Sequence, residues 1–268
     1  MRSLADFEFN KASLGEGVIR ISEIVRADFP TQAVYHELEN LVSLAQEEIS
    51  AAWSEERQLE KLLELFFDEW GFGACRGIYR LSDALWLDQV LQKRQGSAVS
   101  LGAILLWIAQ QLSLPLAPVI FPTQLILRAE TSEELWLINP FNGDTLDEHT
   151  LEVWLKGNIS PIAELFNEDL DEADNAEVVH KMLDTLKAAL MEEGQMEMAL
   201  RASEALLAFN PEDPYEIRDR GLIYAQLECD HIALTDLNYF VEQCPEDPIS
   251  EMIRAQINAI SHKHITLH

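Results

Sequence analysis

The sequence predicts a mostly helical α+β fold, in which a core with a small antiparallel sheet is followed by an all-α stack of repeats. Two observations carry this prediction. A stretch without charged residues lies between Arg94 and Arg128, and it combines a helical pattern with short aliphatic runs. Near the C-terminus, the motif NPEDP that begins at Asn210 returns as CPEDP at Cys244, 34 residues further on (210 to 244).

The segment before Gly96 has the apolar spacing of helices. In AVYHELENLVSLAQEEISAAW, apolar residues recur near the helical period, which predicts an amphipathic helix. A second helix is expected from Glu56 to Trp70, where Gly71 and Gly73 would end it. A third is expected from Ser82 to about Gln92.

The charge-free stretch is long enough to raise the question of a membrane-spanning helix. Pro115 and Pro118 break it. We therefore expect a buried helix from Ser97 to Leu112, with Ser97 as its N-cap, and no membrane segment. The runs VIF, QLILR and LWLIN follow, and they predict an antiparallel pair or triplet of strands between about residues 117 and 139.

The balance of charge restricts the partners. Lys plus Arg number 19 against 47 Asp plus Glu, which gives a formal net charge of −28. Such a field repels phosphate backbones and anionic membrane surfaces, so direct binding to nucleic acid or membrane is not expected. Solubility explains this acidity, and a basic partner is the alternative. Three cysteines without a CxxC pair, and a first segment without an apolar run, favour a cytoplasmic protein.

No cofactor or metal site is expected. Asp169, Asp171 and Asp174 lack the glycine turn and the terminal glutamate of a calcium loop. His262 and His264 form an H-x-H pair, which we interpret as part of a solvated tail.

A period of 34 residues with a helix–turn–helix pattern is typical of tetratricopeptide repeats. The second copy has Gly221 and Ala233 at positions where two helices approach closely. The first copy is weaker, because it has Lys187 where the second has Gly221. A third copy supplies one helix, from Ile249 to about Ser261, that would cap the stack.

These patterns divide the chain into two domains. We predict the first domain over residues 1–160, an acidic linker over 161–178 and the repeats over 179–268. The repeats would bind a protein or peptide, or they would only buttress the first domain.

The motifs of the charge-free stretch resemble a known superfamily. A helix that opens with Gly-x-Cys and ends at a small residue before x-Pro is the transglutaminase-like pattern. Here Gly96-Ser97-Ala98 opens the helix and Ser113-Leu114-Pro115 ends it. Over nearly its whole length, the chain resembles the bacterial SirB-type family of YchA-like proteins, which join a transglutaminase-like domain to tetratricopeptide repeats. The motifs GFGACRGIYRLSDALWLDQVLQKRQGSAVSL, VIFPTQLILR, INPFNGDTL and EIRDRGLIYAQL carry this resemblance.

The resemblance implies a papain-like core whose three catalytic positions have changed. Ala98 stands at the cysteine position, Gln124 at the histidine position and Asn139 at the aspartate position. A papain-like reaction needs a thiolate at the helix N-terminus and a histidine base that a third residue orients. Alanine cannot attack, and glutamine cannot take up a proton near neutral pH. We expect the fold to be kept and the reaction lost, as in a pseudoenzyme.

An enzyme of another kind is the alternative. A hydrolase or amide-transfer enzyme would use a non-standard nucleophile such as Ser100, in the first turn of the same helix. The segment supplies no base for it, so we interpret Ser100 as bonded to backbone. Cys75 is interpreted as structural and His149 as a surface residue. A further alternative is a small amide-bearing ligand held near Gln124 without turnover.

Our main hypothesis is a non-catalytic cytoplasmic adaptor whose repeat groove binds a protein or peptide. Tyr215, Arg218 and Leu222 share one side of a helix and would line that groove, where Arg218 would grip a partner carboxylate. Alternatively, Arg218 pairs with one of the abundant acidic residues nearby, such as Glu212 or Asp213. The resemblance implies a link to virulence-gene regulation in enteric bacteria, which this charge would confine to an indirect route through a protein. The oligomeric state is left open.

Overall fold

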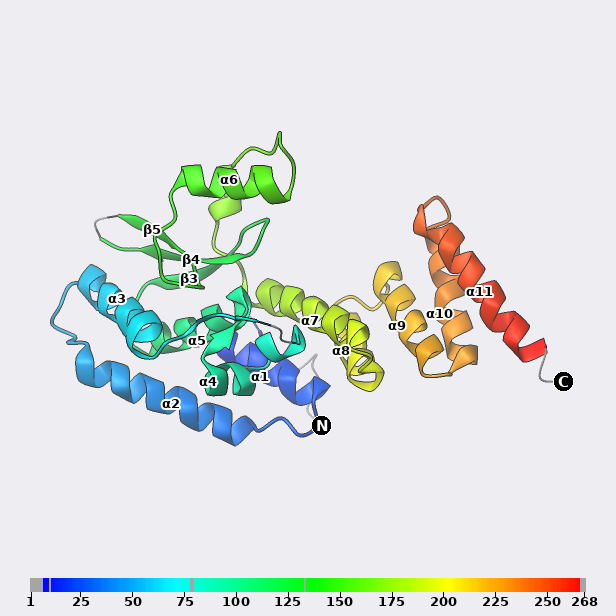
Figure 1. The fold of residues 1–268 in the computed structure, drawn as a ribbon, viewed down its shortest axis with the longest axis horizontal. Helices are drawn as coiled ribbons and strands as arrows, with labels where there is room; N and C mark the ends of the chain where they lie inside the picture. Colours follow the sequence, from blue (N-terminus) through cyan, green and yellow to red (C-terminus); the bar gives the residue numbers. More distant parts are fainter. Residues whose placement is uncertain (1–6, 10, 78–79, 133, 266–268) are drawn as a thin grey trace. The chain divides into compact units, whose positions relative to one another are not determined.

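The computed structural model describes residues 7–9, 11–77, 80–132 and 134–265, and it confirms the mostly helical α+β fold. The chain divides into two compact units. One, here called the core unit, comprises Glu8–Glu23 and Asp28–Met182. The other, the repeat unit, comprises Phe7, Ile24–Ala27 and the residues from Leu183 onward. Figure 1 labels their helices and strands.

Helix formation in the first part of the core unit follows the apolar spacing. The helix α1 covers Leu14–Val25, and α2 covers Thr31–Glu48 and buries Val34, Leu38 and Leu41 on one face. Gly15 lies against α5, since a Cβ there would come within 2.8 Å of the Trp107 ring.

The helix predicted from Glu56 to Trp70 consists of two elements. The α-helix α3 covers Glu55–Leu63, with Ser54 as its N-cap, and a π-helix, η2, continues over Glu64–Glu69. The Trp70 N–H closes η2 by donating to the Leu65 carbonyl, which lies 2.8 Å away. Gly71 then takes a left-handed φ of 72°, which ends the helical segment where glycine was expected to end it.

The prediction of a single helix from Ser82 to about Gln92 is wrong. A short 3₁₀ turn, η3, covers Ser82–Ala84, and the α-helix α4 covers Leu87–Lys93. Trp86 between them has extended backbone angles, so no continuous helix can pass through it. After α4, Arg94 turns left-handed, and the chain enters a two-residue strand.

A pair of very short strands joins this region to the next helix. The strand β1 covers Gly73–Ala74 and β2 covers Gln95–Gly96, and they pair in parallel. Helix α5, Ala98–Gln111, follows with Ser97 as its N-cap, as predicted. Ten of its residues are buried, so α5 is the central helix of the core unit. Among the described residues, none of the helices combines the length and the apolarity that a bilayer-spanning segment needs.

The predicted strands form an antiparallel sheet in the order β3-β4-β5. They cover Leu116–Ile120, Leu125–Glu130 and Leu135–Ile138. One face of the sheet packs on α5, because a Cβ on Gly102 would lie 2.7 Å from Leu125 Cδ2 and 3.5 Å from Leu127 Cδ2.

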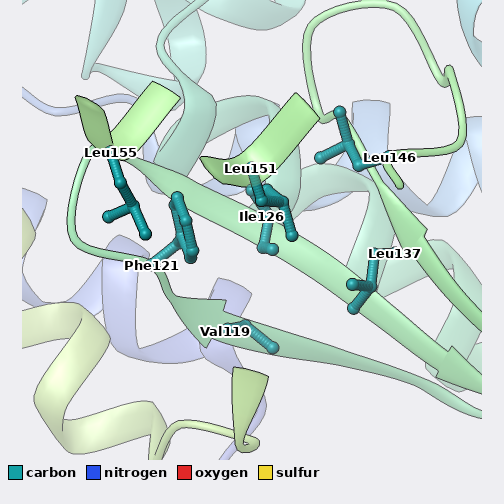
Figure 2. Close-up of a cluster of buried hydrophobic side chains, with 7 residues drawn as sticks. All are labelled: Val119, Phe121, Ile126, Leu137, Leu146, Leu151 and Leu155. Atoms are coloured by element: carbon teal, nitrogen blue, oxygen red, sulfur yellow. The ribbon is translucent and has the colours of Figure 1, made fainter. Parts of the chain in front are cut away.

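The opposite face is covered by helix α6, Glu148–Asn158. Figure 2 shows side chains of the sheet and of α6 meeting in one buried cluster. The cluster consists of Val119, Phe121, Ile126, Leu137, Leu146, Leu151 and Leu155. The sheet is thus buried on both sides, which explains its near-continuous apolar runs.

The acidic segment after α6 contacts the sheet of the core unit. A 3₁₀ turn, η4, covers Asn167–Leu170, and Arg128 Nη1 donates to the Leu170 carbonyl at 3.0 Å. The Ala173 N–H donates to the Pro118 carbonyl at 2.8 Å. Helix α7 covers Asn175–Glu192. The domain bounds predicted at residues 160 and 178 stay a prediction.

The repeat unit consists of helix pairs. After α7 it contains α8 (Met196–Phe209), α9 (Pro214–Gln226), α10 (Asp230–Gln243) and α11 (Ile249–Ile265). Gly221 on α9 lies close to α10, because a Cβ there would come within 2.9 Å of Asp236 Cβ and 3.1 Å of Leu237. The small residue is needed for this close approach of the two helices.

Lys187, at the matching position of the first repeat, is buried with only 3 % of its side chain exposed. Its ammonium group lies 2.6 Å from Glu216 Oε2 and 2.8 Å from Asp219 Oδ2, both on α9. Ser203 on α8 donates to the other oxygen of Glu216. Burial by itself lowers the pKa of Lys187, but the ion pairs and hydrogen bonds with Asp219 and Glu216 outweigh it and raise that pKa above its usual value. Ion pairs of Lys187 therefore hold the first repeat to helix α9 of the second.

Removing the lysine side chain should leave the buried Glu216 carboxylate without a counter-ion, while Asp219 keeps its ion pair with Arg218. We expect Lys187→Ala to lower the free energy of unfolding by about 3 kcal/mol, since breaking a buried ion pair costs on that order. Urea titration followed by circular dichroism measures this. Lys181→Ala, at an exposed position on the same helix, is the control and should cost under about 0.5 kcal/mol. Equal effects of the two substitutions would show that the ion pairs contribute nothing.

Candidate functional site

Ala98, the residue predicted to stand at the nucleophile position, is the first residue of α5. Ala98 follows the N-cap Ser97 directly and is only 7 % exposed. A helix N-terminus carries partial positive charge, which is the setting that lowers the pKa of a cysteine thiol. Here it holds a methyl group, so the favourable field acts on no ionisable atom.

Ser100 is fully buried, and its hydroxyl group is engaged on several sides. Its Oγ donates to the Ala84 carbonyl at 2.6 Å and accepts the Ser97 N–H at 3.0 Å. The Ser97 hydroxyl in turn accepts the Ser100 N–H at 3.2 Å, which completes a capping box. Because the Ser100 proton is bound to a backbone carbonyl, no side-chain base takes it up. The geometry is that of a structural serine.

Gln124 precedes the first residue of β4, in the bend between β3 and β4. Its side-chain nitrogen is buried without a hydrogen-bond partner among the described residues. Asn139 follows β5 directly. Its Oδ1 accepts the Phe141 N–H at 3.0 Å, and its own N–H donates to the Asp144 carbonyl at 2.9 Å. The Asn139 side chain therefore stabilises the turn that follows it.

The register brings Gln124 and Asn139 to one end of the sheet. Leu127 pairs with Ile138, so the start of β4 lies beside the end of β5. Side chains alternate along a strand, and Leu125 and Leu127 point toward α5. Gln124 and Asn139 lie just outside the strands, one residue before β4 and one residue after β5, so this alternation does not fix the direction of their side chains. The sheet thus brings two of the three predicted positions to one of its ends.

A cleft of about 530 Å³ lies beside the start of α5, and Gln95 of β2 is part of its wall. The three family positions do not line it. Its lining residues are Phe67, Asp68, Gly71, Phe72, Gly73, Ala74, Arg76, Gln95, Phe141 and Asn142. The half-buried Cys75 adjoins it in sequence, and burial raises the pKa of this thiol, which is the opposite of activation. His149 is exposed in the first turn of α6.

Among the described residues, no three side chains of His, Cys, Asp or Glu come together in a group that could hold a metal ion. His264 lies in a part of α11 whose side chains are outside the described set.

The three residues predicted to line the repeat groove have different environments. Tyr215 is 47 % exposed, and its hydroxyl donates to Asp247 Oδ2 at 2.8 Å. The Arg218 guanidinium lies 5.5 Å from the Tyr215 ring and 5.3 Å from the Phe240 ring. Leu222 is partly buried and packs against the apolar cluster of α10 and α11.

Arg218 pairs with a nearby carboxylate, as the alternative expected, but this carboxylate belongs to Asp219. The Arg218 Nε and Nη2 donate to Asp219 Oδ1 at 2.9 and 2.6 Å. Glu212 and Asp213 were the examples expected. Asp213 instead caps α9 by accepting the Tyr215 N–H at 2.9 Å.

Sequence reasoning missed the ion pairs of the repeat unit. The Lys187 pairs join the first repeat to the second, and within the second repeat Arg220 on α9 donates from Nε and Nη2 to both oxygens of Asp236 on α10, at 2.7 and 2.8 Å. The lysine at a small-residue position was visible in the repeat alignment. Its partners were not, because they lie 29 and 32 positions further along the chain.

Comparison with known proteins agrees with this architecture. Residues 32–184 match a model of the transglutaminase-like superfamily, and residues 186–258 match a tetratricopeptide repeat model. The chain is 80% identical to Protein SirB1 of Salmonella typhimurium and 76% identical to the UPF0162 protein YchA of Escherichia coli strain K12. A UPF0162 protein of Vibrio cholerae is 40% identical. Each of these matches covers 100% of both chains. The chain therefore belongs to the transglutaminase-like superfamily, within the family of SirB1 and YchA.

Proposed function

We propose that this protein is a non-catalytic protein-interaction protein, an adaptor that keeps a transglutaminase-like domain as a packed platform and binds its partner through tetratricopeptide repeats. One observation carries the proposal. The helix N-terminus that presents the nucleophile in this superfamily holds Ala98, and the hydroxyl group nearest to it in sequence, on Ser100, is buried and donates to a backbone carbonyl. Neither residue supplies a reactive atom.

The repeats support a role in binding polypeptides, because such stacks present extended surfaces to partners. We place the partner surface on α9, around Tyr215 and Arg218. Tyr215 offers an exposed aromatic ring, and the Arg218 guanidinium lies over that ring in a cation–π contact. Any influence on gene regulation would act through such a protein partner in the cytoplasm, since a net charge of −28 repels DNA.

The competing enzyme function predicts a covalent adduct. The full-length protein should be incubated with a fluorophosphonate probe for serine nucleophiles and an iodoacetamide probe for thiolates, and then examined by mass spectrometry. We expect no serine adduct. An adduct on Ser100, or on any other serine, would overturn the non-catalytic proposal.

Ser100→Ala separates a structural role from a catalytic one. The substitution removes the Ser100 hydroxyl from the Ala84 carbonyl and the Ser97 N–H, which keep their direct hydrogen bond of 2.9 Å to each other. We therefore expect it to lower the free energy of unfolding by about 1 kcal/mol. Ser43→Ala, which removes an exposed hydroxyl bonded to Glu39 on α2, is the control and should cost under about 0.5 kcal/mol. A loss of cellular function with unchanged stability would instead indicate chemistry at Ser100.

Tyr215→Ala should weaken partner capture without unfolding the repeats. A central aromatic residue of an interface contributes on the order of 2 kcal/mol, so we expect about a thirtyfold weaker interaction with the captured protein. Tyr215→Phe removes only the hydrogen bond to Asp247 and should keep most binding. Met252→Ala, at an exposed position on α11, is the matched control. If the Tyr215→Ala protein captured the partner at full yield, the partner surface would not lie on this side of α9.

A further inference from the structure

A second cleft of the core unit lies between α3–η2 and the sheet, and it has a volume of about 520 Å³. One wall comes from the helical segment and the other from β5 and the turn after it. The lining residues are Glu60, Leu63, Glu64, Phe67, Asp68, Glu134, Leu135, Trp136, Asn142, Gly143, Asp144 and Thr145. Phe67, Asp68 and Asn142 also line the cleft beside α5, so the two hollows are neighbours.

The π-helix η2 orients two successive aromatic rings differently. Phe66 is fully buried and stacks on Phe72 with ring centroids 4.3 Å apart. Phe67 lines the cleft, where Gly143 closes over it with a left-handed φ of 76°. A Cβ on Gly143 would lie 2.6 Å from the Phe67 ring. Together with Trp136, Phe67 gives the cleft an aromatic lining.

The sheet contributes an open strand edge to this cleft. β5 is the last strand in the order β3-β4-β5. The second half of its outer edge is covered, because the Leu146 N–H donates to the Leu137 carbonyl at 2.7 Å and Ile138 bridges to Thr145. Backbone groups alternate in direction along a strand, so Leu135 turns its N–H and C=O outward like Leu137. No described strand covers Leu135, whose side chain is 45 % exposed in the cleft.

The cleft carries charge of one sign only. Five of its lining residues are Asp or Glu, and none is Lys or Arg. The nearby Lys61 pairs with Glu64 and Glu69. Within the described part of the chain, Glu60 and Asp68 form no ion pair of their own. Two carboxylates at the rim are thus available to a cation.

We propose that this cleft binds an extended polypeptide segment that carries lysine or arginine side chains, and that the segment adds to β5 as a further strand beside Leu135. An open edge with pockets for alternate side chains is how sheets recognise extended peptides. The carboxylates select basic side chains, and the aromatic floor accommodates their aliphatic stems. A second copy of this chain does not fit, because its charge of −28 repels an acidic cleft.

This inference deepens the proposed function, on which it rests, by giving the adaptor a second partner surface on the core unit. The two can fail separately. A serine adduct contradicts the non-catalytic function, whether or not the protein binds the peptide. If the protein forms no serine adduct and also binds no peptide, only the proposal of a peptide site in this cleft is contradicted.

The probe is a fluorescein-labelled peptide of alternating lysine and threonine, titrated with the full-length protein and followed by fluorescence anisotropy at physiological salt. We expect saturable binding, and none for the matching peptide of glutamate and threonine. N-methylation of alternate peptide nitrogens removes the donors needed for strand addition and keeps the charge. It should weaken binding about fivefold, because the peptide loses the one donor that the outward Leu135 carbonyl accepts, and one hydrogen bond contributes about 1 kcal/mol. Equal affinity of the methylated peptide would show attraction by charge alone, as for a polyamine, and would overturn strand addition.

A pair of protein variants locates the site. Glu60→Gln combined with Asp68→Asn should weaken the lysine peptide about fivefold, because each exposed charge pair contributes modestly. The control, Glu47→Gln combined with Glu48→Gln, removes two exposed carboxylates from α2 and should leave the affinity unchanged. Equal losses in both variants would show that the peptide responds to the overall charge and not to the cleft.

Discussion

The core unit depends on the hydrogen bonds of Ser100 at the start of α5. The Ser100 hydroxyl connects the Ala84 carbonyl of the preceding 3₁₀ turn with the Ser97 N–H of the cap, in an interior where an unpaired polar group is costly. Gly96 is needed beside it, because a Cβ there would lie 2.6 Å from Ser100 Oγ. The N-terminus of α5 is thus closed by its own capping residues, Ser97 and Ser100.

Local patterns predicted much of the core unit, and contacts distant in sequence explain where they failed. The apolar run of α5, its cap at Ser97 and the three strands could be predicted, because each depends on neighbouring residues. The break at Trp86 could not, since apolar spacing alone continues through it. The pairing of Gly73 with Gln95 also escaped prediction, because two-residue strands have no alternation to detect.

The candidate site also has a part that could be predicted from sequence motifs and a part that could not. The assignment of Ala98, Gln124 and Asn139 to the three catalytic positions rests on motif resemblance, and it stays a prediction. What those positions do in the fold required coordinates: Asn139 stabilises its own turn, and Ser100 is fully engaged with backbone. The cleft along β5 combines α3, η2 and a loop more than sixty positions away, so no single stretch of sequence reveals it.

Equivalent positions of the two repeats carry different residues, a lysine in the first and a glycine in the second, and this difference restricts the order in which the repeats can follow one another. Gly221 permits close packing within its own repeat, whereas Lys187 reaches across to carboxylates on the following helix pair. The joint between the first and second repeats is therefore chemically unlike the joint between the second repeat and α11. If a repeat were duplicated or moved, the buried lysine could lose its carboxylate partners. In the same way, the buried carboxylates could lose their lysine. In this way the array fixes its own length and sequence of units, although each unit has the same helical shape.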